Sequence, residues 1–238
     1  MNARWAVIEK QDFQHNFDLH VHTRHSIDSA MDPKRIIKTM AKKGLDGIAV
    51  TDHNTIKGAL EVVEQAPSGV FVIVGSEIKT TIGEIIGLFL NEEISSSDPL
   101  EVIDEIRAQG GLTILPHPFR SHVFTGSPLP HNMEIVEQVD AIEVFNARTP
   151  SPANEQAFLL AQKTNKPMVA GSDAHFYPEI GRARTLLPPF CDEKELKNAI
   201  LNGNTKIEKE SFTFRRSLPF CFFSFIHGRG NRLLTRIL

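Results

Sequence analysis

Histidines and carboxylates in this 238-residue chain recur at similar places along the sequence. Each group ends or directly follows a short apolar run; the residues are His20, His22, Asp52, His53, Glu77, His117, Asp173 and His175. Mixed imidazole and carboxylate ligands suit zinc, manganese or iron, whereas magnesium and calcium prefer oxygen alone. Buried together, so many ionisable groups would be costly to desolvate unless cations neutralised them. The pattern therefore predicts a centre of divalent cations.

The triplet His20-Val21-His22 has the spacing of two ligands on one strand. Alternate residues of an extended strand point to the same face, so both rings can reach one cation while Val21 packs behind them. Taken alone, this pair or the single His117 is weak support, because histidine is common in protein cores. The joint pattern carries the prediction.

The elements that must position these residues are short apolar runs that alternate with amphipathic ones. Continuous apolar strands indicate a parallel sheet covered by helices, closed into a barrel or open and doubly wound. Strands are expected at 17–21, 46–51, 70–75, 84–90, 112–116, 140–145 and 167–171, and helices at 33–43, 55–65, 98–109, 153–164 and 192–201. The candidate ligands fall at the carboxyl ends of strands, where parallel α/β barrels build their active sites.

Composition bounds the function classes. The formal net charge of −3 argues against a wholly basic nucleic-acid-binding surface but allows a local basic cleft for phosphates. Cys191 and Cys221 form no CxxC motif, and no run approaches the length needed to span a bilayer. We expect a cytoplasmic protein without a transmembrane segment.

Five segments, taken in order, resemble the successive motifs of the PHP superfamily, the polymerase and histidinol phosphatase domains. They are DLHVHTRHSIDSAMDP (18–33), GIAVTDHNTIKG (47–58), VGSEI (74–78), LPHP (115–118) and GSDAH (171–175). The resemblance covers residues 17 to about 200. It implies a distorted (β/α)7-type barrel of mostly parallel strands with helices outside, a PHP domain over 1–205, and a basic, Phe-rich extension over 206–238.

The resemblance also implies two or three divalent cations, of zinc, manganese or iron. The first would be held by His20, His22, Glu77 and Asp173, the second by Glu77 and His117, and the third by Asp28, His53 and His175. Glu84 stands where the family commonly has another histidine for the second cation. It either binds that cation, with altered metal preference, or lines the mouth.

The function implied is hydrolysis of phosphate esters by metal-activated water. The substrate would be a phosphorylated small molecule, a nucleotide or a short nucleic acid. His175 or Asp52 is the candidate for moving a proton, although Asp52 could instead orient a ligand ring. Arginine forks pair well with phosphate, and the candidates in the loops are Arg24, Arg120, Arg148 and Arg182.

Two other functions stay open. A polynuclear barrel could hydrolyse C–N bonds as an amidohydrolase, or it could serve as a non-catalytic metal-binding module. The segment from about Glu210 onwards is rich in arginine and phenylalanine and lacks acids. It would pack against the barrel, or contact a membrane surface or phosphates.

Overall fold

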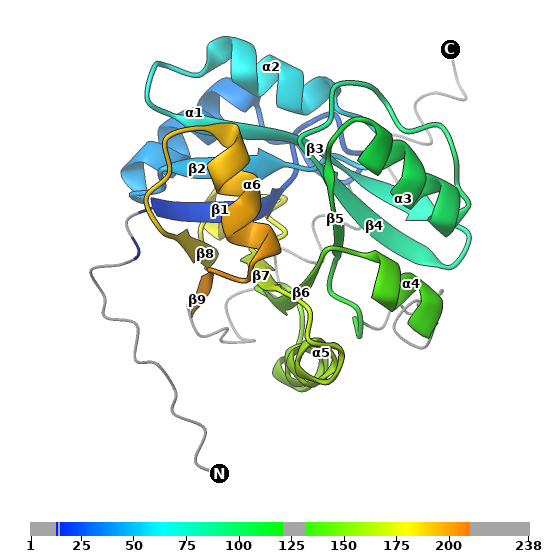
Figure 1. Ribbon diagram of the computed structural model, residues 1–238. Coiled ribbons are helices and arrows are strands. Elements are labelled where there is room, and N and C mark those ends of the chain that lie inside the picture. Colours follow the sequence, from blue (N-terminus) through cyan, green and yellow to red (C-terminus); the bar gives the residue numbers. More distant parts are fainter. Residues whose placement is uncertain (1–12, 14, 121–131, 210–238) are drawn as a thin grey trace.

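One curled sheet organises the computed structural model, which describes residues 13, 15–120 and 132–209 (Figure 1). Within these ranges the sheet has nine strands, in the order β7-β6-β5-β4-β3-β2-β1-β8-β9. The strands are β1 (His15–Val21), β2 (Gly47–Val50), β3 (Phe71–Thr80), β4 (Gly83–Leu88), β5 (Leu112–Leu115), β6 (Ala141–Asn146), β7 (Met168–Gly171), β8 (Ala183–Leu187) and β9 (Lys206–Lys209).

Helices surround this sheet, most of them on its outer face, and α6 lies across one end of it (Figure 1). They are α1 (Pro33–Lys42), α2 (Lys57–Gln65), α3 (Pro99–Ala108), α4 (Met133–Gln138), α5 (Ser151–Thr164), α6 (Glu193–Leu201) and the short 3-10 helix η3 (Tyr177–Glu179). Asp32 and Asp98 cap α1 and α3, and each is followed by a proline at the first helical position. Gly44 and Gly110, two residues beyond the last residues of α1 and α3, have φ of 67° and 71°, the left-handed conformation in which helices commonly end.

The sheet is nearly closed into a barrel. The Oγ1 of Thr185 in β8 bonds both the amide and the carbonyl of Ala170 in β7, at 2.8 and 2.9 Å. A single bridge also joins Val21 to Ala174. Opposite ends of the strand order therefore meet through a few bonds instead of a full ladder, and the expected α/β barrel with outer helices is confirmed.

The strand expected at 84–90 is one of the strands that do not run parallel in this mostly parallel sheet. β4 pairs antiparallel with both β3 and β5. Only Thr81 and Ile82 connect β3 to β4, which suffices for a hairpin but is far too short for a parallel crossover. β8 also runs antiparallel to β1, and β8, β9 and α4 are additional to the expected elements.

The barrel interior is apolar at the end away from the candidate ligands. Residues from strands around the sheet, such as Phe17, Ile73 and Ile114, form one buried cluster with Leu196 and Ile200 of α6. α6 thus closes this end. A second cluster joins Val21 to Ile36 and Met40 under α1, so Val21 packs behind the two histidines as expected.

The sheet continues through β9 to Lys209, beyond residue 205, and β9 pairs with β8. The Phe-rich segment 210–238 lies outside the described residues.

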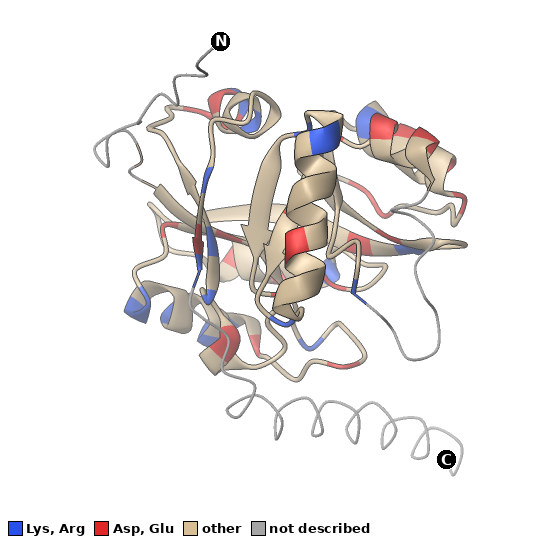
Figure 2. Ribbon diagram, turned by 90° about the horizontal axis from the view of Figure 1, so that it is seen from below, with Lys and Arg blue, Asp and Glu red and all other residues tan. Residues whose placement is uncertain are grey.

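Among the described helices, none has the length and apolar character required to cross a membrane. Figure 2 shows both acidic and basic residues on the outside of the fold, in keeping with the small net charge.

Candidate metal centre

Loops and strand ends from around the barrel bring nine ligand-type side chains to one mouth. β1 contributes His20 and continues to His22, while β2 is followed by His53, β5 by His117 and β7 by Asp173 and His175. Glu77 lies inside β3 and not after it, because the hairpin extends this strand to Thr80. Since β4 runs in the reverse direction, Glu84 near its start also reaches the mouth.

Four atoms converge at the expected first site. The Nε2 atoms of His20 and His22 lie 3.1 Å apart, and each is 3.4 Å from Glu77 Oε2. Asp173 Oδ1 is 3.7 Å from His20 Nε2 and 3.4 Å from His22 Nε2. Ligands around a tetrahedral ion with bonds of about 2.0–2.1 Å to nitrogen stand about 3.3 Å from one another. The ligand atoms of His20, His22 and Asp173 therefore have a spacing that fits one cation, and Glu77 Oε2 lies at a similar distance from both imidazole nitrogens.

Glu77 also faces the expected second site with its other oxygen. Its Oε1 lies 2.9 Å from His117 Nε2, which in turn is 3.9 Å from Glu84 Oε2. The Oε2 of Glu77 lies 3.1 Å from His53 Nδ1. Ligand atoms of His53, Glu77 and Glu84 lie within 4.8 Å of one another, so the geometry allows Glu84 to act as a ligand.

A third group surrounds Asp28. Its Oδ2 is 3.1 Å from His175 Nε2 and 3.5 Å from His53 Nε2. Its other oxygen, Oδ1, is buried and has no hydrogen-bond partner among the described residues. Buried carboxylate oxygens are rarely left in this state unless an ion or water satisfies them. The donor set of two imidazoles and a carboxylate suits a transition metal ion.

Hydrogen bonds at the back of the ligand rings determine which nitrogen faces the mouth. Ser26 Oγ donates to Asp52 Oδ1 at 2.6 Å, so it accepts from His22 Nδ1 at 3.0 Å. The proton of neutral His22 is thereby kept on Nδ1, leaving the Nε2 lone pair for a cation. Asp52 also accepts from the amide and the hydroxyl of Thr23, at 2.7 Å each. Asp52 thus orients a ligand ring indirectly, through Ser26.

Glu143 contacts the ring nitrogen of His20 that faces away from the mouth, and the sequence analysis did not identify this residue. Its Oε1 lies 3.0 Å from His20 Nδ1, and its Oε2 accepts from the His117 amide at 2.8 Å and from Asn146 Nδ2 at 3.1 Å. Glu143 is buried in β6, within the otherwise apolar run AIEVF. A carboxylate inside such a run needs a buried partner, and this signal could have identified it.

The surroundings shift the pKa values of the two rings of the first site in opposite directions. Burial lowers the pKa of His22 to about 3, and repulsion from His175 adds to the effect. Burial also opposes the charge on His20, but Glu143 and Glu77 outweigh it and hold the pKa of His20 well above its usual range. The His20 imidazolium therefore donates its Nε2 proton to His22 Nε2. A divalent cation would replace this shared proton.

The acids around the rings stay ionised. Burial opposes ionisation of Glu77 and Asp173, yet His20 with His53 depresses the pKa of Glu77, and Arg120 with His20 depresses that of Asp173. For His53, burial again opposes the charge, but the carboxylates of Glu77 and Asp28 raise its pKa to about 9. Without a cation, the carboxylates thus favour the protonated forms of His20 and His53.

The four candidate arginines are placed differently. Arg120 pairs with Asp173 Oδ2, and Arg148 contacts His175 Nδ1 and the Asp173 carbonyl, so both lie at the mouth. Arg24 is held on the surface by Asp32 and Glu61. Arg182 is half-buried after η3, and its amide donates to the Glu179 carbonyl. The structure therefore brings Arg120 and Arg148 to the ligands, whereas Asp32 and Glu61 hold Arg24 on the surface.

Backbone strain gathers at the same place. His117 and Asp173 have φ of 26° and 55°, in the left-handed region that residues other than glycine rarely adopt. Gly171, the last residue of β7 and two residues before Asp173, lies so close to the His20 side chain that a Cβ at this position would collide with it. Tight packing thus fixes the positions of the ligands.

Models of known protein families match most of the described part of this chain. A model of the PHP domain matches residues 18–167, and a model described as PHP-associated matches residues 151–205. An uncharacterized protein of Methanocaldococcus jannaschii is 43% identical over 142 residues, which cover 55% of this chain and 81% of that protein.

Two solved structures share the fold at low sequence identity. A proposed metal-dependent phosphoesterase of Bifidobacterium adolescentis has a TM-score of 0.58 and 16% identity, over 79% of this chain and 96% of that one. The lesion-specific endonuclease of Pyrococcus furiosus has a TM-score of 0.61 and 15% identity, over 87% of this chain and 66% of that one. On the match to residues 18–167, the chain belongs to the PHP domain family.

Proposed function

We propose that this protein hydrolyses phosphate esters with two or three divalent cations of zinc, manganese or iron. The observation that carries the proposal is the joint position of the ligand cluster and two arginines. His20, His22 and Glu77 gather at the mouth where Arg120 and Arg148 also lie. Metal ligands alone would suit several hydrolases, whereas guanidinium groups beside them favour a phosphate substrate.

Nine side chains would hold the cations. Glu77 would be shared by the first and second cations, since its Oε2 belongs to the first group and its Oε1 lies beside His117. The remaining ligands are His20, His22 and Asp173 for the first, Glu84 for the second, and Asp28, His53 and His175 for the third. When bound, such cations polarise phosphoryl oxygens and lower the pKa of a water molecule towards neutrality.

The protein's own groups position the substrate and the ligands. Arg120 and Arg148 would bind non-bridging phosphate oxygens and hold the ester over the cluster. Asp52 was a candidate for proton transfer, but its oxygens already accept from Thr23 and Ser26. We therefore assign Asp52 the role of orienting His22. His175 stays the candidate for moving a proton, and only while it is not bound to a cation.

The test is a hydrolysis assay on protein purified without chelators and supplied in turn with Mn²⁺, Zn²⁺ and Fe²⁺. The substrates are p-nitrophenyl phosphate, bis-p-nitrophenyl phosphate, nucleotides and an N-acyl amino acid panel. We expect turnover of phosphate esters and its loss in His22→Ala. His25→Ala is the matched control, because His25 is a neighbouring histidine that bonds Glu61 on the surface. Folded protein that hydrolyses only the amides, or nothing with any metal, would refute the proposal.

A further inference from the structure

Helix α1 carries a stripe of positive charge beside the metal centre. Lys34, Lys38 and Lys42 are spaced one helical turn apart, and all three are exposed. Arg35 lies next to this stripe and is also exposed. Successive turns of a helix rise by about 5.4 Å, so the three ammonium groups follow one line along the surface. α1 itself contains no acid.

A groove of about 480 Å³ follows this stripe. It is lined by the four basic residues together with Asp32, Thr39 and Tyr177. The Arg35 guanidinium lies 4.1 Å from the centre of the Tyr177 ring, and the Tyr177 hydroxyl accepts from the Asp32 amide at 2.7 Å. Asp32, the acid in the groove, is paired with Arg24. The groove therefore offers cations and a fixed aromatic ring.

The groove leads to the third ligand group. Tyr177 is two residues from His175, and Asp32 is four residues from Asp28. Ser29 joins the two loops, because its hydroxyl donates to the His175 carbonyl at 3.2 Å. The amino-terminal end of the stripe thus lies beside the ligands, and its other end runs away from the mouth along the outside of the barrel.

We propose that this groove binds the sugar–phosphate backbone of a single-stranded nucleic acid whose end reaches the metal centre. The inference rests on the proposed function and narrows its substrate class. Lysines in a line match a chain of phosphates, and a small phosphomonoester at the mouth would not reach them. Such binding is compatible with the net charge of −3, because the positive charge is local.

The test measures binding separately from hydrolysis. Fluorescence anisotropy of a labelled oligothymidine of about ten nucleotides is recorded with the full chain in EDTA, over a series of salt concentrations. The wild type should bind with a log–log salt slope of about −2 to −3, as three or four phosphate contacts to a single strand require. The variant K34E/K38E/K42E should bind at least tenfold more weakly, with a slope closer to zero by about 2.

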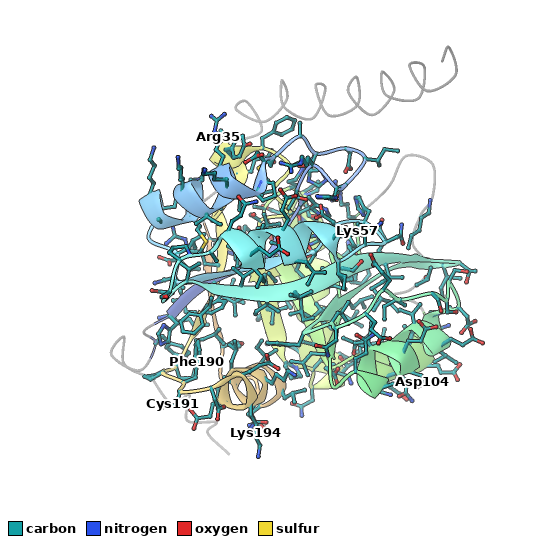
Figure 3. All side chains as sticks on the ribbon, turned by 90° about the horizontal axis from the view of Figure 1, so that it is seen from above. Arg35, Lys57, Asp104, Phe190, Cys191 and Lys194 are labelled. Carbon is teal, nitrogen blue, oxygen red and sulfur yellow. The ribbon has the colours of Figure 1, made fainter. Side chains whose placement is uncertain are left out.

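The matched control is K163E/K194E/K206E, which changes the same amount of charge on exposed lysines of α5, α6 and β9. Figure 3 places Lys194 on the side of the molecule opposite Arg35. This control should keep the wild-type affinity. If charge reversal prevents folding of K34E/K38E/K42E, the neutral variant K34Q/K38Q/K42Q takes its place as the test variant. Equal losses in both triple variants, no binding at low salt, or binding to anionic vesicles in place of the oligonucleotide would overturn the inference. Hydrolysis of p-nitrophenyl phosphate should survive K34Q/K38Q/K42Q, so the two proposals can fail independently.

Discussion

Ser26 accepts a hydrogen bond from His22 Nδ1 at 3.0 Å, and this bond turns the His22 Nε2 towards the other ligands. The same hydroxyl accepts from the His53 amide at 3.1 Å and donates to Asp52. One small side chain thereby ties together the loops after β1 and β2. Ring orientation at the first site depends on it.

Replacing Ser26 with alanine should weaken metal binding by about 10–100-fold, the usual effect of losing a partner behind a ligand histidine. It should also lower the free energy of unfolding by about 1–3 kcal/mol, because buried Asp52 loses a donor. Titration calorimetry with Zn²⁺ and urea unfolding measure the two effects. Ser68→Ala, on an exposed turn, is the control. Equal zinc affinity in the two variants would contradict the role given to Ser26.

Glu143→Gln should also weaken metal binding by about 10–100-fold, since a neutral amide makes His20 a poorer ligand. Its amide nitrogen would face either the His20 Nδ1 proton or the donors from His117 and Asn146. Metal content after dialysis against a weak chelator gives the measurement. Retention of the full metal content would show that Glu143 does not support His20.

Metal affinity should rise with pH between about 6 and 9. The pKa of His53, about 9, means that this ring must release a proton before it can bind a cation. Stability of the metal-free protein should change in the opposite direction. Because the pKa of His53 is higher in the folded protein than in the unfolded chain, protonated His53 stabilises the fold. This contribution is complete below the unfolded-chain pKa of about 6.5 and is lost as the pH rises through 9.

Melting temperatures recorded with EDTA and with Mn²⁺ across this range measure both trends. The stabilisation by metal should grow with each step in pH. A metal-induced shift that stays constant or shrinks from pH 6 to 8 would contradict the assignment of protonated histidines to the ligand cluster.

Arg120→Ala should raise KM for a phosphate ester by about 10–100-fold, the equivalent of one charge-assisted hydrogen bond of about 1.5–3 kcal/mol. Arg24→Ala is the matched control, because Asp32 and Glu61 already hold this guanidinium away from the ligands. Steady-state kinetics with a phosphate ester give the KM of each variant for comparison with the wild type. A larger KM effect at Arg24 would mean that substrate approaches from the α2 side.

The helices and most strands could be predicted because their apolar periods and caps are local signals. Asp98-Pro99 and Gly110 mark α3 without reference to the rest of the fold. The reversal of β4 was not predicted, since a continuous apolar run looks the same in either direction and only the short connection through Thr81 and Ile82 sets it. β9 is an exposed edge strand with almost no apolar signal.

The candidate ligands could be proposed because most of them belong to short motifs at or near the ends of apolar runs. Glu143 and Ser26 could not, since their roles arise from contacts across the fold. Glu143 is 123 residues from His20, and Ser26 reaches Asp52 from 26 residues away. The arginines show the same limit. All four follow strands in the sequence, but only the folded loops distinguish Arg120 and Arg148 from Arg24 and Arg182.

The most direct test of the central claim is a crystal structure of the protein grown with Mn²⁺, with anomalous diffraction recorded from the metal. The account predicts an anomalous peak between His20, His22, Glu77 and Asp173, and a second one between Glu77 and His117. A well-ordered mouth that shows no peak at saturating Mn²⁺, or peaks only elsewhere on the surface, would contradict it.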